Sequence, residues 1–206
     1  MQTGDYVVHI VDDEEPVRKS LAFLLTMAGF TARVHDSATS FLALAPGLTQ
    51  GLLVTDLRMP DMNGVELLTK LGDNGAMLPA IVISGHGDVP MAVAAMKAGA
   101  LDFIEKPFED EVLIASIKRA AECIGESSPQ TDDAAKVLER MEHLSEREKQ
   151  VLSAVVAGLP NKTIAYDLEI SPRTVEVHRA NVMAKMQAKS LAELVRMTLA
   201  AGRALN

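Results

Sequence analysis

The chain has 206 residues, of which 48% are hydrophobic and only 3% aromatic, so it is long enough for two domains with largely aliphatic cores. Its single cysteine, Cys123, excludes an intramolecular disulfide and fits a reducing compartment. The chain does not begin with a basic segment followed by a long apolar stretch, and no apolar run approaches the ~20 residues that cross a bilayer. We therefore expect a cytoplasmic protein without membrane attachment.

The net charge of −8 is unevenly distributed along the chain. Residues 1–124 carry 17 acidic and 9 basic side chains, and residues 125–143 carry 5 and 2. Residues 144–206 instead carry 6 acidic and 9 basic side chains. This asymmetry predicts a basic tail domain that can approach a polyanion, although so small an excess does not by itself establish nucleic-acid binding.

The first part of the chain alternates short apolar runs with amphipathic helical patterns. Continuous β-branched runs of this length are typical of parallel strands buried on both faces, and five βα units predict a doubly wound five-stranded parallel sheet of the α/β class. The expected strands are Tyr6–Val11, Thr31–Val34, Gly51–Thr55, Ala80–Ser84 and Asp102–Ile104. The expected helices are Glu15–Ala28, Ser37–Ala45, Val65–Leu71, Val89–Ala98 and Asp110–Ile124.

A polar segment then predicts a linker. Residues 125–133 are rich in Gly, Pro, Ser and Asp, and a short helical pattern at Ala134–Met141 continues the connection to residue 143. The linker separates a first domain, residues 1–124, from a second, residues 144–206.

The second domain shows helical periodicity only. Ser145 and Glu148 form a capping-box pattern at the start of its first helix. Asn161, Ser171 and Ser190 are expected to cap the next three helices. The expected helices are Glu146–Ala157, Asn161–Leu168, Pro172–Met186 and Leu191 to about Ala200.

Acidic residues end two of the apolar runs. Asp12 and Asp13 follow the first expected strand, and Asp56 follows the third. Ligands of parallel sheets collect at the carboxyl ends of the strands, so these three carboxylates are expected to converge. They would repel one another unless a hard divalent cation lay among them, and Mg²⁺ is the cation that such oxygen ligands favour. Taken singly, each Asp is more commonly a helix cap; together they predict phosphoryl chemistry.

Further motifs complete a known pattern, and with them residues 1–124 resemble the receiver domain of two-component response regulators. The resemblance implies a flavodoxin-like sheet whose site lies at the carboxyl ends of its strands. The motifs, in chain order, are Asp12-Asp13, Asp56, Met59-Pro60 with Gly64, Ser84 and Lys106-Pro107.

This resemblance implies that Asp56 accepts a phosphoryl group. Its carboxylate would attack phosphorus and form an acyl phosphate, a reaction that depends on positioning and charge neutralisation. Lys106 would supply a positive charge to the phosphate oxygens and Ser84 a hydrogen bond. A cis peptide bond is expected between Lys106 and Pro107. Read alone, Lys106 is an ordinary surface residue and Ser84 part of an ordinary turn.

The same resemblance implies the ligands of the cation. Mg²⁺ is expected on the side chains of Asp13 and Asp56 and on the backbone carbonyl of Arg58, with Asp12 acting through water. The bound Mg²⁺ would neutralise the phosphate oxygens during transfer.

Phe103 stands at the position of the family's switch aromatic residue. In this interpretation Ser84 moves toward the phosphoryl group and Phe103 rotates into the vacated space. The face formed by the fourth helix, fifth strand and fifth helix would change, and such receivers commonly dimerise there. The alternative is that Phe103 is only a buried strand residue.

The tail resembles the four-helix LuxR/NarL-type helix-turn-helix domain, and the two domains in this order resemble the FixJ type of nitrogen-fixation regulators. The resemblance implies a transcription activator that an oxygen-sensing haem kinase phosphorylates. The motifs that carry it are Leu144–Glu148, Asn161–Ala165, Ser171–His178, Asn181–Met186 and Ser190–Val195.

In such a domain the helix Asn161–Leu168 is the positioning helix, and Pro172–Met186 is the recognition helix, whose N-terminal half enters the major groove. Phosphate contacts fix the register, whereas contacts to base edges specify the sequence. The residues expected to face the groove are Arg173, Thr174, Glu176, Val177, Arg179 and Ala180. The residues expected on phosphates are Lys162, Asn181 and Lys185.

The sequence thus favours a phosphorylation-controlled, DNA-binding transcriptional activator. Its expected partners are a sensor histidine kinase, double-stranded DNA, a second copy of the chain when phosphorylated, and RNA polymerase. We do not expect an enzyme beyond Mg²⁺-dependent phosphorylation and dephosphorylation of its own aspartate. One alternative is an aspartyl phosphotransferase or phosphatase, which commonly has a second Asp where this chain has Arg58. The other is an adaptor whose tail binds protein or RNA.

Overall fold

The structure is a computed structural model that describes residues 6–48, 51–75, 78–85, 89–122, 124 and 131–204. The chain divides into two compact units, one of residues 1–87 and 97–127 and the other of residues 88–96 and 128–206. The second division between the units falls at residues 127 and 128, inside the expected linker of residues 125–143, so residues 128–143 group with the second unit. Residues 125–130 of that linker lie outside the described residues.

The first unit contains a five-stranded parallel sheet with the strand order β2-β1-β3-β4-β5. The doubly wound parallel fold expected from the sequence is therefore confirmed. Because the chain runs outward in both directions from β1 and β3, the strand order reverses between these two strands, and such a point is where open α/β sheets bind ligands. The strands are β1 (Val7–Val11), β2 (Thr31–His35), β3 (Leu52–Asp56), β4 (Ala80–Ser84) and β5 (Asp102–Glu105).

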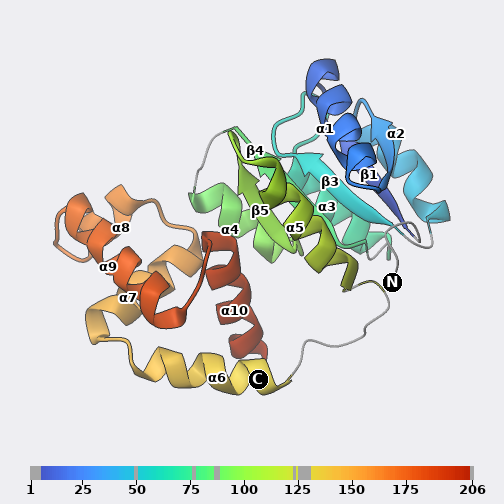
Figure 1. Cartoon of the computed structure of the whole chain (residues 1–206). Helices are drawn as coiled ribbons and strands as arrows, with labels where there is room; N and C mark the ends of the chain where they lie inside the picture. The colour runs from blue at the N-terminus through green and yellow to red at the C-terminus, as the bar shows by residue number, and fades with distance from the viewer. Residues whose placement is uncertain are drawn as a thin grey trace. The chain divides into compact units, whose positions relative to one another are not determined.

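Helices cover both faces of this sheet (Figure 1). Alternate residues of the central strands, such as Ile10 and Val54, point to the face on which α1 and α5 pack, with Leu25 and Ile117 buried against them. Each strand and helix of this unit ends within two residues of its expected bounds. The helices are α1 (Glu15–Met27), α2 (Ala38–Leu44), the short 3-10 turn η1 (Ala45–Gly47), α3 (Gly64–Asp73) and α5 (Asp110–Glu122). Between β4 and β5 the chain also forms α4 (Val89–Lys97), whose residues 89–96 group with the second unit.

The chain after residue 130 is helical. Two apolar clusters hold these helices together: one joins α6, α7, α9 and α10, and the other joins α7, α8 and α9. No helix in the described parts of the chain is long and apolar enough to cross a membrane. The helices are α6 (Thr131–Glu142), α7 (Glu146–Ala157), α8 (Asn161–Asp167), α9 (Pro172–Met186) and α10 (Leu191–Ala204).

Local sequence explains where most of these helices begin. The capping box of Ser145 and Glu148 is present, and the Ser171 side chain accepts a hydrogen bond from the backbone N–H of Thr174, as predicted. The prediction for Asn161 is wrong, because Pro160 precedes α8 and no side chain caps it. Asn161 is instead the first residue of α8, and its side chain does not cap that helix.

Candidate functional site

Two of the expected carboxylates lie at the reversal point of the sheet. Asp56 is the last residue of β3, and Asp12 directly follows β1. The two strands are paired in register, Val11 with Thr55, so their carboxyl ends present these side chains to the same place. Both are largely withdrawn from water, with 3% of the Asp12 side chain and 11% of the Asp56 side chain exposed.

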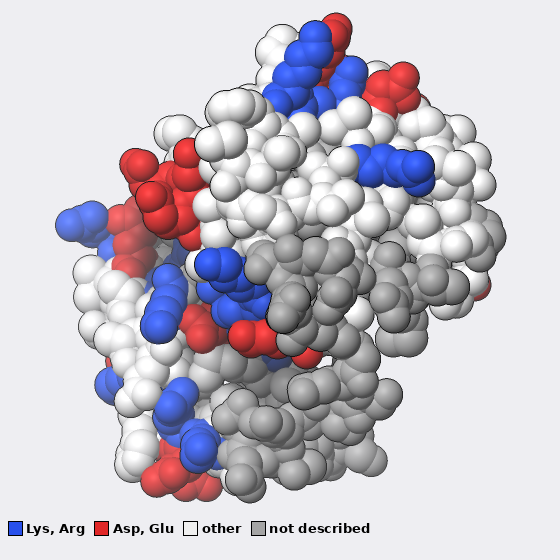
Figure 2. All heavy atoms as spheres, turned by 45° about the vertical axis from the view of Figure 1, so that its right-hand side comes forward, with Lys and Arg blue, Asp and Glu red and all other residues white. Residues whose placement is uncertain are grey.

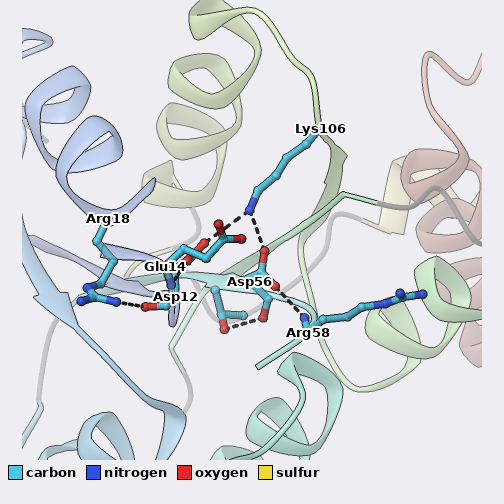
Figure 3. A network of polar contacts seen from close by, with 7 residues as sticks. Asp12, Glu14, Arg18, Asp56, Arg58 and Lys106 are labelled. Carbon is cyan, nitrogen blue, oxygen red and sulfur yellow. Dashed lines mark hydrogen bonds and ion pairs between the residues drawn. The ribbon is translucent and has the colours of Figure 1, made fainter. Parts of the chain in front are cut away.

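Lys106 joins the two carboxylates (Figure 3). Its Nζ lies 2.7 Å from Oδ1 of Asp56 and 3.3 Å from Oδ2 of Asp12. The lysine comes from the loop after β5, where its backbone N–H donates to the carbonyl of Ser84 at 2.7 Å. The Lys106–Pro107 peptide bond is cis, as predicted. Residues from three separate strand ends thus form one charged cluster.

Backbone groups fix the orientation of both carboxylates (Figure 3). The N–H of Arg58 donates to Oδ2 of Asp56 at 2.6 Å, and the N–H of Glu14 donates to Oδ1 of Asp12 at 2.8 Å. Arg18 of α1 donates from Nη1 to the backbone carbonyl of Asp12 at 2.6 Å. The sequence analysis missed Arg18, because the contact joins a side chain to a backbone atom and leaves no pattern of residue types.

The ionisation of the cluster follows from burial and from these contacts. Burial raises the pKa of Asp12, and the N–H of Glu14 and the charge of Lys106 oppose that rise only in part. For Lys106, burial lowers the pKa, but the hydrogen bond and the charge of Asp56, with the charge of Asp12, outweigh it and leave the pKa raised. The lysine therefore remains an ammonium ion between the two carboxyl groups.

The backbone beside Asp56 requires a glycine. A Cβ atom on Gly64, the first residue of α3, would lie 2.7 Å from the carbonyl oxygen of Asp56 and 3.3 Å from Cα of Leu57. The N–H of Gly64 also donates to the carbonyl of Leu57 at 2.9 Å. The close approach holds the loop after β3 against the strand, and with it the carboxylate of Asp56.

The structure does not bring three carboxylates together. Within the described residues, no three Asp, Glu, His or Cys side chains are placed to hold a metal ion. Asp13 is exposed, whereas Asp12 and Asp56 meet through Lys106, whose ammonium group supplies the compensating charge. The expected donors, carboxylates and the carbonyl of Arg58, are all oxygen atoms, which suits Mg²⁺. The donor chemistry therefore fits the cation.

The two expected switch residues lie on neighbouring strands. Ser84 ends β4 and is 1% exposed, and it is aligned with Glu105 of β5. Phe103 of β5 is aligned with Val82 and is half-buried, so it is neither a fully buried core residue nor an exposed one.

In the second unit, α9 has one exposed stripe. Val175, Val182 and Met186 are buried, as expected for the inward face of this helix. Val177 is 50% exposed although it is apolar. Arg173 and Glu176 form an ion pair at 3.0 Å across one turn. The exposed residues of the stripe that were expected at DNA are Arg173, Glu176, Val177, Ala180 and Asn181.

The structure places three other expected DNA contacts differently. Thr174 is half-buried, and its hydroxyl is hydrogen-bonded to that of Ser171 at 2.8 Å. Arg179 is half-buried and donates to Oδ1 of Asn161 at 2.8 Å, so it joins α9 to α8. Lys185 donates to Glu148 at 2.7 Å. Thr174 thus contacts the N-cap residue of its own helix, whereas Arg179 and Lys185 contact residues of α8 and α7.

Charges of both signs share the surface. Among the atoms that Figure 2 colours, basic and acidic side chains are interspersed and form no continuous basic area on the face drawn. Lys162 of α8, which was also expected at a phosphate, is exposed.

Comparisons with known proteins agree with this geometry. The family described as "Response regulator receiver domain" matches residues 8–118, and "Bacterial regulatory proteins, luxR family" matches residues 142–198. The "Transcriptional regulatory protein FixJ" of Rhizobium meliloti (strain 1021) is 70% identical over 198 residues, which are 96% of this chain and 97% of that protein. The chain is a response regulator of the FixJ type. This response regulator is therefore a phosphorylation-activated transcription regulator.

Other matches cover either nearly the whole chain or a part of it. A "Transcriptional regulatory protein FixJ" from Azorhizobium caulinodans is 54% identical over 195 residues, 95% of this chain and 92% of that protein. A crystal structure of full-length FixJ from B. japonicum is 47% identical, covers 98% of this response regulator and 99% of that chain, and has a TM-score of 0.58. The structure named FixJ-N covers 63% of this chain and 100% of its own, with 67% identity and a TM-score of 0.57.

Proposed function

We propose that Asp56 is the phosphoacceptor and that it takes its phosphoryl group from a sensor histidine kinase. One of its carboxylate oxygens attacks phosphorus, and the bond between phosphorus and the nitrogen of the donor breaks. The proposal is supported chiefly by one observation, the contact of Lys106 Nζ with Oδ1 of Asp56 at 2.7 Å. A cation so placed can neutralise the oxygens of the transferred group, which is the main requirement of phosphoryl transfer.

The residues available to hold Mg²⁺ are Asp13, Asp56 and the backbone carbonyl of Arg58, with Asp12 acting through water. When bound, the ion supplies positive charge to the oxygens of the transferred phosphoryl group. Asp12 stays in place through its contacts with Glu14 and Lys106. Dephosphorylation at the same site needs no further residue, so this chemistry makes a self-modifying receiver rather than an enzyme with a separate substrate.

The switch is assigned to Ser84 and Phe103. The buried hydroxyl of Ser84 hydrogen-bonds the phosphoryl group on Asp56, and the half-buried ring of Phe103 moves into the space that opens. Because Phe103 belongs to β5, this movement alters the face formed by β5 and α5. Two phosphorylated receivers associate through that face, and dimerisation follows phosphorylation.

The dimer binds double-stranded DNA through α8 and α9. Two recognition helices would occupy half-sites about one helical turn apart or a multiple of that distance. On the exposed stripe of α9, Val177 can meet a thymine methyl group and Asn181 or Arg173 can donate to base edges or phosphates. Lys162 provides a phosphate contact from α8. RNA polymerase is the further partner that an activator requires.

The regulated genes are inferred from the relatives. Several are named FixJ, and the resemblance to that type implies activation of nitrogen-fixation genes under oxygen control, with an oxygen-sensing haem kinase as phosphodonor. None of the residues at the site senses oxygen, so that signal belongs to the kinase. We place this chain in the cytoplasm, where the kinase domain and the promoter are both accessible.

A phosphorylation assay tests the proposal directly. The full chain is incubated with Mg²⁺ and acetyl phosphate, and intact-protein mass spectrometry follows the gain of one phosphoryl group. The wild type and Asp61→Asn should gain it, since Asp61, in the loop after β3, accepts hydrogen bonds from Thr39 of α2 rather than from Lys106. The Asp56→Asn variant should not gain a phosphoryl group. Equal phosphorylation of Asp56→Asn, or none in the wild type, would rule out Asp56 as the acceptor.

A further inference from the structure

The last backbone carbonyl of the recognition helix α9, that of Met186, accepts a hydrogen bond from another part of the same unit. The last four carbonyls of any helix lack partners within it. Gln187 adopts the left-handed conformation at φ 56° after α9, and its N–H and that of Ala188 bond back to the carbonyls of Ala184 and Met183. The carbonyl of Met186 is satisfied differently, by a residue 46 positions earlier in the chain.

That residue is Arg140 of α6, whose Nη1 donates to the carbonyl of Met186 at 3.2 Å. A second basic side chain lies at the same end of α9: Lys185 donates to Oε2 of Glu148 at 2.7 Å and to the carbonyl of His143 at 3.4 Å. Positive groups at the C-terminal end of a helix are favoured by its dipole. The segment from α6 to the first turn of α7 therefore fastens the C-terminal end of α9.

Apolar packing joins the same elements. Val137 of α6 is only 4% exposed and belongs to one buried cluster with Val182 and Met186 of α9 and Leu194 of α10. Residues 142–198 match the luxR family, so α6, which ends at Glu142, lies almost entirely outside that motif. The helix that follows the receiver in the chain is thus packed on the back of the DNA-binding motif.

We propose that α6 is a fifth helix of the DNA-binding unit and that Arg140 is a positioning residue for the recognition helix. It acts through the backbone of Met186, without touching DNA, and keeps the exposed stripe of α9 at the angle that base contacts require. The proposal rests on the proposed function, because it assigns α9 to the major groove. It makes specific binding depend on a residue outside the family's DNA-binding motif.

The test compares two duplexes. One is selected from a random pool by the phosphorylated wild-type chain, and the other has a random sequence; both are measured at several salt concentrations. Full-length, phosphorylated Arg140→Gln should bind the selected duplex about tenfold more weakly, the size expected for losing a hydrogen bond from a charged donor. Its affinity for the random duplex and its salt dependence should equal those of the wild type. Arg147→Gln is the matched control, since Arg147 is exposed and donates only to Gln150 among the described residues.

Two more variants separate positioning from other roles. Arg140→Lys keeps a hydrogen-bond donor and should bind the selected duplex almost as tightly as the wild type. Val137→Ala loosens the packing of α6 without a change of charge, and it should weaken binding to the selected duplex, as Arg140→Gln does. A phosphate contact would instead reduce the salt slope by about one and weaken both duplexes. That result would overturn the proposal. The proposal would also fail if Arg140→Gln and Val137→Ala both bound the selected duplex with an affinity within twofold of the wild type. If the wild type selects no duplex, the proposed function fails, and this inference fails with it.

Discussion

Gly64 shows how an uncharged residue controls the position of the Asp56 carboxylate. Its missing side chain lets α3 begin against the carbonyl of Asp56, with only 2.7 Å available for a Cβ atom. Real Cβ atoms do not approach a backbone oxygen so closely, so a methyl group would displace the end of β3 or the start of α3. The catalytic geometry therefore depends on a steric condition as well as on charge.

We predict that Gly64→Ala slows phosphorylation by small phosphodonors by at least about tenfold, because a misplacement on the order of 1 Å can cost more than that. It should also lower the stability of the receiver by about 1–3 kcal/mol. Initial rates of phosphoryl incorporation and urea unfolding provide the measurements. Gly72→Ala is the control: nothing lies within 4 Å of its Cβ position, and it should retain the wild-type rate.

His9 is a second residue whose environment has a measurable consequence. Its ring is 1% exposed, and Nδ1 lies 3.0 Å from Nε2 of His35, while the ring of Phe41 packs against both histidines. Burial, followed by the charges of His35 and Arg33, lowers the pKa of His9 to about 4. The folded receiver thus favours the neutral imidazole.

Because the folded-state pKa lies below the ordinary value of 6.5, the stabilisation is complete above about pH 6.5 and is lost as the pH falls toward 4. The receiver should lose on the order of 3 kcal/mol across this interval from His9. Urea unfolding followed through NMR signals of the sheet at a series of pH values measures it. The exposed His143→Gln should leave the profile unchanged, and a flat profile between pH 6.5 and 4.5 in the wild type would refute the assignment.

At the scale of elements, the second unit is fastened by polar contacts between helices that are distant in sequence. The Glu148 side chain, 5% exposed, pairs with Lys185, and the same carboxylate closes the capping box of α7. The hydrogen bonds from Lys185 and from the Ser145 backbone lower the pKa of Glu148 to about 2. This carboxylate therefore stays ionised and stabilises the unit at neutral pH, and that contribution is lost as the pH falls from about 4.5 toward 2.

We predict that Lys185→Met lowers the stability of the helical unit by about 1–2 kcal/mol, less than for a fully buried pair because Lys185 is 42% exposed. Thermal unfolding measures this loss. Lys149→Met removes an exposed pair with Glu146 and should change the stability by less than about 0.5 kcal/mol. If Lys185 were mainly a phosphate contact, stability would stay constant and the salt slope of DNA binding would fall by about one.

Apolar periodicity and capping residues predicted the bounds of these helices and strands well, because such bounds depend on residues that are close together in the chain. The strand and helix bounds of the receiver and the capping box of α7 followed from local patterns. The partner of Glu148 did not, because Lys185 lies on α9, 37 residues further along the chain.

The remaining contacts could not be read from local sequence. Arg179 was expected at DNA but donates to Asn161, because the crossing of α8 and α9 brings the two together from 18 residues apart. Similarly, the motif residues identified the cluster of Asp12, Asp56 and Lys106, but only the fold shows that the lysine lies between the two carboxylates. Which atoms meet depends on packing angles that residue types do not specify.

For the whole molecule, the central claim is that one chemical change in the receiver controls the behaviour of the DNA-binding unit. The two units have separate cores. Dimerisation is the simplest way for a receiver to change DNA affinity, since two linked recognition helices can occupy both half-sites together.

The most direct measurement is sedimentation velocity of the full chain with Mg²⁺, with and without acetyl phosphate, combined with footprinting on the duplex selected by the wild type. We predict that phosphodonor converts monomer to dimer and produces protection over two half-sites, and that Asp56→Asn shows neither change. A monomer that persists after phosphorylation of Asp56 has been verified by mass, or an Asp56→Asn variant that dimerises and protects DNA as the wild type does, would contradict this account.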